Sequence, residues 1–167
     1  PGAKHSLFSA ITVALDPGDE IIIPTPCWTY EGMVRIINGK PLFVETPEEK
    51  GFKLDPESVK EEISEDTEAL LLNYPNNPTG TLLDLGQLEA LAEIAEDHDL
   101  WIITDEIYER LVYGVEKPSI ASFTSVSDRT VYVNGFSKSY AMTGWRLGYT
   151  AGPENFISEM VKIQQNS

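Results

Sequence analysis

At 167 residues the chain is long enough for one domain with a sizeable core, and 12 basic against 27 acidic residues give it a formal charge of −15. This acidic balance argues against a nucleic-acid partner or an anionic membrane surface, although a few local cations still permit a phosphate pocket. The chain has one cysteine, Cys27, so it cannot form an internal disulfide, and this fits a reducing, cytoplasmic compartment. The cysteine and the two histidines are too dispersed for metal-ligand spacing. No apolar run is long enough to cross a membrane.

The hydrophobic pattern alternates between a helical period and short apolar runs, with turn residues between them. In chain order it predicts a helix over residues 4–15, a strand over 20–24, a helix from about 30 to 39, a strand over 41–45, a helix over 55–64, a strand over 69–74, a helix over 84–98, a strand over 101–104, a short helical piece near 120, strands over 130–134 and 146–151, and a helix over 153–165. Alternating strands and helices are typical of an α/β fold, so we expect a doubly wound, mostly parallel sheet with helices on both faces. Because ligands bind at the carboxyl ends of the strands in such sheets, the residues that follow the strands form the candidate site.

Two features of the first quarter of the chain carry candidate site residues. Gly2, Ala3 and Lys4 stand where the first helix starts, and free N–H groups together with the positive end of the helix dipole suit an anion there. Almost every helix has such a start, so this signal is weak alone. Trp28 follows the first strand, and its indole fits either a core or domain-interface position or a ring stacked on a flat ligand.

The third and fourth strands are also followed by polar side chains. Two prolines and a glycine fix the loop over residues 76–80, which is either a plain tight turn or a rigid mount that presents the amide of Asn77 to a ligand. Asp105 ends a buried strand, where a carboxylate is costly unless it is paired. Tyr108 follows three residues later, so one helical turn would aim both side chains at the same place.

The fifth strand leads into a stretch over residues 134–149 that holds Lys138 among small and hydroxyl residues, with Arg146 eight positions later. A lysine amine is a nucleophile toward carbonyl groups once its charge is suppressed, and an arginine fork suits phosphate. A cofactor that has both a carbonyl group and a phosphate is pyridoxal phosphate (PLP), an electron sink. The alternative is a surface loop with a solvated lysine.

Three motifs together resemble the aspartate-aminotransferase-like family of PLP enzymes, fold type I, class I and II. They are Asn76-Asn77-Pro78-Thr79-Gly80, Asp105-Glu106-Ile107-Tyr108, and Ser137-Lys138 followed by Thr143-Gly144-Trp145-Arg146-Leu147-Gly148. The resemblance covers essentially the whole chain and implies that residues 1–167 are the central part of the family's PLP-binding large domain. It implies an aminotransferase that moves an amino group from an amino acid to a 2-oxo acid, works as a homodimer in its full-length form and uses no metal.

The resemblance also implies a role for each candidate residue. Lys138 is similar to the lysine that binds PLP covalently and moves the proton between the substrate's α-carbon and the cofactor. Asp105 is similar to the carboxylate that pairs with the pyridine nitrogen. The remaining matches place Tyr108 and Asn77 on the ring's 3′-oxygen, Trp28 on the ring face, and Arg146 with the N–H groups of Gly2, Ala3 and Lys4 on the phosphate.

The sequence departs from the family pattern in two ways. Many relatives have a phosphate-binding serine three positions before the lysine, where this chain has Gly135, so we expect Ser137 to supply the hydroxyl. The family's chains also run beyond both ends of this one, and the sequence opens at Pro1-Gly2 without an initiator methionine. We therefore expect a piece without the N-terminal arm or the small domain that binds the substrate's α-carboxylate, and we expect it to be inactive alone.

Two other functions remain open on this fold. One is a PLP-dependent C–S β-lyase, although such lyases more often have histidine where Tyr108 stands, which favours transamination modestly. The other is the PLP-sensing domain of a transcription regulator, whose DNA-binding helix-turn-helix does not occur in these residues. The identity of the amino donor and acceptor stays open.

Overall fold

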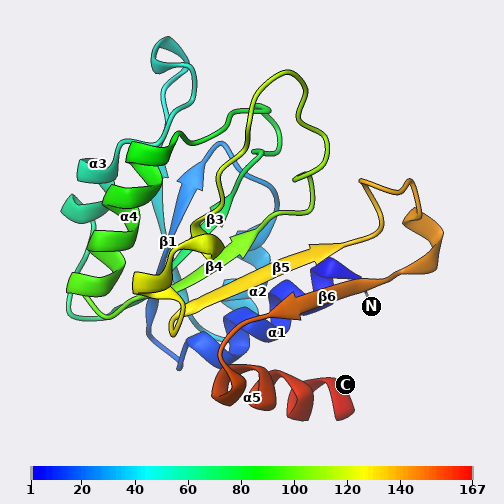
Figure 1. Cartoon of the computed structure of the whole chain (residues 1–167). Helices are drawn as coiled ribbons and strands as arrows, with labels where there is room; N and C mark the ends of the chain where they lie inside the picture. The colour runs from blue at the N-terminus through cyan, green and yellow to red at the C-terminus, as the bar shows by residue number, and fades with distance from the viewer. Residues whose placement is uncertain (1, 167) are drawn as a thin grey trace.

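The computed structural model describes residues 2–166, which form one six-stranded sheet with helices on both faces (Figure 1). The strands are β1 (Glu20–Thr25), β2 (Lys40–Glu45), β3 (Thr67–Asn73), β4 (Trp101–Asp105), β5 (Thr130–Gly135) and β6 (Gly148–Ala151). The α-helices are α1 (Ala3–Ala14), α2 (Tyr30–Ile36), α3 (Pro56–Glu61), α4 (Leu85–Asp97) and α5 (Glu154–Gln165). Short 3₁₀ turns cover η1 (Glu48–Lys50), η2 (Ile120–Ser122), η3 (Thr124–Val126) and η4 (Thr143–Trp145).

The sheet has the order β2-β1-β3-β4-β5-β6, and every neighbouring pair is parallel except β5 with β6. The predicted doubly wound, mostly parallel α/β fold is therefore confirmed. The chain leaves β1 for β2 on one side and then returns past β1 to β3, so the direction of winding reverses between β1 and β3. Such a reversal opens a crevice at the carboxyl ends of the two strands, where ligands bind in this class of fold.

Apolar side chains cover both faces of the sheet, which explains why its strands appear as continuous apolar runs in the sequence. Ile21 and Ile23 of β1 face the cluster that α1, α2 and α5 complete. Ile22, between them, faces the other cluster, which α3, α4 and η2 complete. A strand alternates its side chains in this way, so the two layers of helices follow from the sequence of the buried strands.

Local side-chain capping sets the start of two helices, α4 and α3. The side chain of Asp84 accepts from the N–H of Gln87, whose side chain returns the bond to the backbone N–H of Asp84, a complete capping box on α4. Asp55 accepts from the N–H of Glu57, and Pro56 occupies the first helical position of α3. Within residues 2–166, no helix is both long and apolar enough to cross a bilayer.

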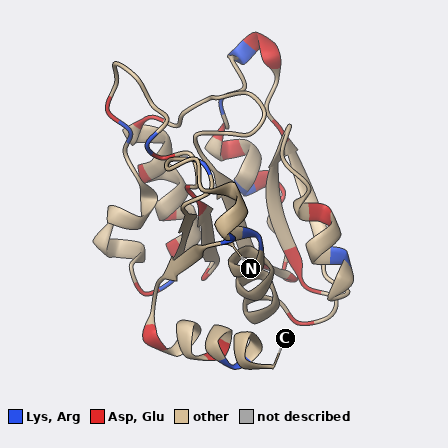
Figure 2. Cartoon of the chain, turned by 90° about the vertical axis from the view of Figure 1, so that its right-hand side faces the viewer, with Lys and Arg blue, Asp and Glu red and all other residues tan. Residues whose placement is uncertain are grey.

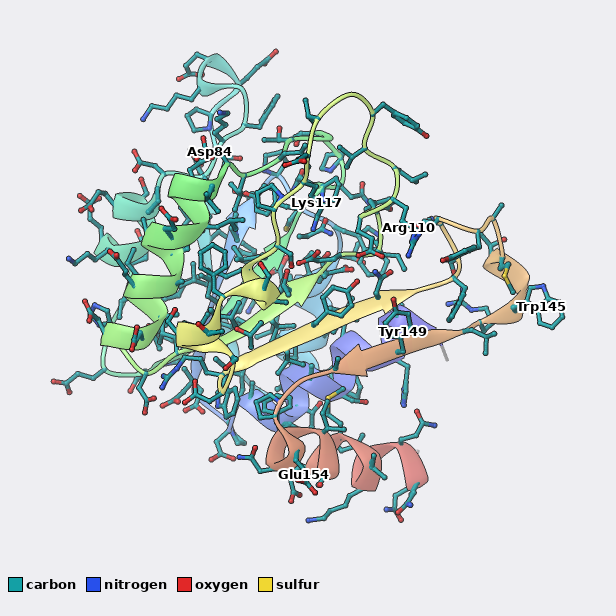
Figure 3. The ribbon with its side chains drawn as sticks, in the orientation of Figure 1. Asp84, Arg110, Lys117, Trp145, Tyr149 and Glu154 are labelled. Carbon is teal, nitrogen blue, oxygen red and sulfur yellow. The ribbon has the colours of Figure 1, made fainter. Side chains whose placement is uncertain are left out.

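The sixth strand starts later than the sequence pattern predicts. It begins at Gly148 rather than Arg146, because Arg146 has a left-handed backbone with φ of 52° directly after η4. This turn takes the chain from the loop after β5 into an antiparallel return along it. The connection extends beyond the sheet, and Trp145 lies at its outer tip pointing away from the protein (Figure 3).

Candidate cofactor site

A cavity of about 350 Å³ lies at the carboxyl ends of β1, β3, β4 and β5, beside the point where the winding of the sheet reverses. Its volume is in the range of small-molecule sites. Every site residue that the sequence indicates lines this cavity except Gly2: the wall contains Ala3, Lys4, Trp28, Asn77, Asp105, Tyr108, Ser137, Lys138 and Arg146. Residues from five separate segments are therefore gathered around one space.

One end of the cavity combines an arginine with the start of a helix. Gly2, with a φ of 76°, precedes α1, and among residues 2–166 no side-chain hydrogen bond caps the helix there. The first N–H groups of a helix have no partner within the helix, so they can bind an anion. The guanidinium of Arg146 lies against Gly2, because a Cβ on that glycine would be 3.2 Å from Nη2. Figure 2 shows ribbon coloured for Lys and Arg beside the start of α1, in a chain that has 27 acidic but only 12 basic residues. This corner suits an anion such as phosphate.

A buried part of the cavity wall is formed by Asp105. Its side chain is 4% exposed at the end of β4, and its oxygens are held separately. Oδ2 accepts a 2.8 Å hydrogen bond from the phenol of Tyr30, and Oδ1 accepts one of 3.2 Å from the N–H of Ile107. Burial raises the pKa of Asp105 from 3.8 to about 6, against the lowering effect of these two bonds. A carboxylate held in this way can pair with a protonated ring nitrogen.

Tyr108 and Asn77 meet at the side of the cavity. The amide Nδ2 of Asn77 donates to the phenol oxygen of Tyr108 over 3.2 Å, although the two residues belong to different loops. The backbone N–H of Asn77 donates in turn to the side chain of Asn73, which donates from its own amide to the carbonyl of Asp105. Asn73 thus ties the loop after β3 to the end of β4 and fixes the two polar groups near each other.

Lys138 enters the cavity from the loop that follows β5. Its ammonium lies 5.9 Å from the centre of the Tyr108 ring, its side chain is exposed, and Ser137 lines the wall beside it. The glycine that stands where many relatives have serine has a steric explanation. A Cβ on Gly135 would lie 2.9 Å from the carbonyl oxygen of Leu147, so the close approach of β6 disfavours a side chain there.

Trp28 fits both of the interpretations that its sequence context allows. Its indole packs against the apolar cluster of α1 and α2, and it meets Tyr30 edge to face with ring centres 5.7 Å apart. It also lines the cavity, where the ammonium of Lys4 lies 4.8 Å above its ring. Trp28 is therefore a partly buried residue of the cavity wall.

The structure adds cavity residues that the sequence did not indicate. Tyr30 and Asn73 are the most informative, because each bonds to Asp105, and Leu7, Ile107 and Thr143 complete the wall. Asn73 gave a usable signal, since it is a polar residue at the end of an apolar strand. Tyr30 gave none, because an aromatic residue at the start of a helix more often packs in a core.

Comparison with known proteins places the chain in a family. The sequence model for aminotransferases of class I and II matches residues 1–167, which is the whole chain. The chain belongs to the class I and II aminotransferase family. Members of this family use pyridoxal phosphate, which agrees with the resemblance that the three motifs show.

The relatives agree in sequence and in fold. The aspartate aminotransferases of Bacillus subtilis and Geobacillus stearothermophilus are 47% and 45% identical to this family member, each over 99% of the chain. The structure of Thermus thermophilus aspartate aminotransferase with maleate has a TM-score of 0.96 and 44% identity, and an aromatic aminotransferase of Pyrococcus horikoshii has a TM-score of 0.96 and 42% identity. The chain spans 43% of the length of the two curated relatives.

Proposed function

We propose that this chain forms the PLP-binding part of an aminotransferase, which transfers an amino group from an amino acid to a 2-oxo acid. One observation carries the proposal: Asp105, at the end of β4, lines a single cavity at the carboxyl edge of the sheet together with Lys138 and Arg146 from the segment after β5. A lysine, a buried carboxylate and a cation at a helix start are the three groups that a phosphorylated pyridine aldehyde requires.

The residues of the cavity fit PLP by their chemistry. Arg146 and the N–H groups at the start of α1, including those of Ala3 and Lys4, would hold the phosphate. Asp105 would hold the ring nitrogen protonated, because an ionised carboxylate favours a cation beside it. The face of Trp28 would support the ring, and Asn77 and Tyr108 would donate to its 3′-oxygen.

When bound, PLP supplies an electron sink for the bond that breaks at the substrate's α-carbon. Lys138 would hold the cofactor through its side-chain nitrogen, and its amine would take the proton from the substrate's α-carbon. Tyr108, whose pKa is raised by burial and by Asp105, stays a neutral donor in this pocket. Ser137, beside the lysine, is the hydroxyl that we assign to the phosphate end.

The proposal extends to the whole protein. We propose that residues 1–167 belong to the large domain, that the full-length protein is a cytoplasmic homodimer, and that the group binding the substrate's α-carboxylate lies outside this span. Aspartate is the first amino donor to test because the most similar relatives are named aspartate aminotransferases, and an aromatic amino acid is the second because of the Pyrococcus relative.

The decisive experiment replaces Lys138 by alanine in the full protein. The wild type should show the visible absorbance of lysine-bound PLP, and borohydride should fix the cofactor to the peptide that contains Lys138. Lys138→Ala should lose both, whereas Lys162→Ala, which removes an exposed lysine of α5, should keep both. Borohydride fixation at another lysine would refute the assignment. Formation of pyruvate and ammonia instead of a new amino acid would show a β-lyase.

A further inference from the structure

The phenol of Tyr30 is directed into the protein at the end of the cavity that Asp105 forms. Tyr30 is the first residue of α2, is 1% exposed, and is among the largest fully buried side chains. Its hydroxyl donates to Oδ2 of Asp105 over 2.8 Å, although 75 positions separate the two residues in the sequence. A buried polar group with this geometry has a defined partner rather than a place in the general packing.

The hydrogen bond from Tyr30 completes a fixed orientation of the carboxylate. The N–H of Ile107 occupies the other oxygen, Oδ1, at 3.2 Å, and Asn73 holds the backbone carbonyl of the same aspartate at 3.0 Å. With one donor on each oxygen, the plane of the carboxylate is set before any ligand arrives. Each oxygen still has a lone pair for a donor in the cavity.

The same hydrogen bond favours the ionised form of the Asp105 carboxylate. Burial and, to a smaller extent, the negative charge of Glu106 raise the pKa of Asp105, whereas the hydrogen bonds from Tyr30 and from the N–H of Ile107 lower it, and the net result is a pKa of about 6. The pKa of Tyr30 itself is raised well above its usual value by burial and by Asp105, so its hydroxyl keeps its proton and remains a donor. The other titratable groups that face this cavity are Tyr108 on the same loop, Lys4 on α1, and Lys138 and Arg146 from the segment after β5.

We propose that Tyr30 is a positioning residue that orients Asp105 and weakens its basicity, so that the shared proton stays on the cofactor's ring nitrogen. The inference rests on the proposed function, because the ring nitrogen is that of PLP. A carboxylate that already accepts a hydrogen bond from a phenol competes less well for a proton. Tyr30 would therefore act on the cofactor only through Asp105.

The test is Tyr30→Phe in the full protein, which removes the hydroxyl and keeps the buried ring. In the cofactor-free protein, the carboxyl carbon of Asp105 is followed by ¹³C NMR against pH. The wild-type midpoint should lie near 6, and Tyr30→Phe should raise it by about one pH unit, as expected for losing one hydrogen bond to a charged group. Tyr74→Phe is the matched control, since Tyr74 is another buried tyrosine outside the cavity, and it should leave the midpoint unchanged.

A second measurement uses the protein loaded with PLP labelled with ¹⁵N in the ring. The nitrogen signal should be that of a protonated pyridine in the wild type and should move toward the neutral value in Tyr30→Phe, because a more basic Asp105 withdraws the proton. A residue that only filled space would change neither the midpoint nor the nitrogen signal. An unchanged midpoint in Tyr30→Phe overturns the inference.

The role of Tyr30 can be tested separately from the binding of PLP, and one of the tests needs no variant. The titration of Asp105 needs no cofactor, so a wild type that fails to bind PLP refutes the function and, with it, the part of the inference that concerns the ring nitrogen. In the wild type alone, the ring carbons of Tyr30 should shift with the same midpoint as Asp105. Independent midpoints would overturn the link between the two residues without any substitution.

Discussion

The burial of Asp105 predicts that this protein gives up stability to keep a carboxylate in its cofactor cavity. In the cofactor-free protein the pKa of Asp105 is raised from 3.8 to about 6, and the group is shielded from water. A shift of about two pH units corresponds to about 3 kcal/mol of unfolding free energy. An acid with a raised pKa binds more protons when folded, so stability falls as pH rises from about 4 to about 6 and stays lower above that range.

Asp105→Asn should therefore stabilise the cofactor-free protein at high pH. The asparagine amide removes the buried charge but has one acceptor oxygen instead of two. One of the hydrogen bonds from Tyr30 and Ile107 is therefore lost, which lowers the unfolding free energy by about 1 kcal/mol. The net gain should be about 2 kcal/mol at pH 8 and should vanish, or reverse by about 1 kcal/mol, at pH 4. Urea unfolding at both pH values measures the difference. Equal unfolding free energies of the two proteins at pH 8 would show that burying the charged carboxylate does not destabilise the fold.

Three further substitutions test other parts of the fold and the cavity. Arg146→Gln should weaken the binding of PLP by about tenfold to a hundredfold, measured by equilibrium dialysis, but leave pyridoxal binding unchanged because that compound has no phosphate. Lys117→Met should lower the unfolding free energy by about 3–5 kcal/mol in urea unfolding, because Glu106, 2% exposed, loses the cation of its buried ion pair. Gly148→Ala should cost about 1–3 kcal/mol in the same assay, since its Cβ would overlap the backbone at the start of α1, whereas Gly32→Ala on open α2 surface should be neutral or slightly stabilising.

Each of these predictions has a result that contradicts it. An equal loss of PLP and pyridoxal affinity in Arg146→Gln would mean that the arginine does not act on the phosphate. If the double change Lys117→Met with Glu106→Gln is no more stable than Lys117→Met alone, an unpaired Glu106 is not the cause of the loss. Full stability of Gly148→Ala would show that β6 and α1 can separate without cost.

The sequence predicted the elements well where the signal is local. The capping box of α4 and the proline at the start of α3 involve neighbouring residues, and both are present in the structure. The start of β6 was predicted two residues early because the pattern of apolar residues does not register the left-handed backbone of Arg146. The guanidinium of Arg146 also lies against Gly2, near the other end of the chain, and no local pattern contains such a contact.

The candidate site was predictable for the residues that have distinctive chemistry at strand ends. Lys138, Asp105 and Asn77 stand just beyond apolar runs, and the topology of a parallel sheet brings such positions together at one edge. Tyr30 was not predicted as a site residue because its hydrogen bond with Asp105 joins residues 75 positions apart. Its neighbours in the sequence are those of an ordinary helix start.

The cavity divides into a buried end and an open end, and the cost of removing charge from water explains the division. The buried carboxylate, Asp105, has donors on both oxygens, and its pKa is raised enough that it can be neutralised when no cation is present. The cations Lys4, Lys138 and Arg146 have exposed side chains, so their charges stay in contact with solvent. A ligand with a phosphate at the open end and a ring nitrogen at the buried end pairs with the cations and with Asp105 at the same time. A free phosphate would leave Asp105 without a cation. A free pyridine would leave the cations without an anion. Selectivity for a molecule that carries both groups therefore follows from where the chain buries its charges.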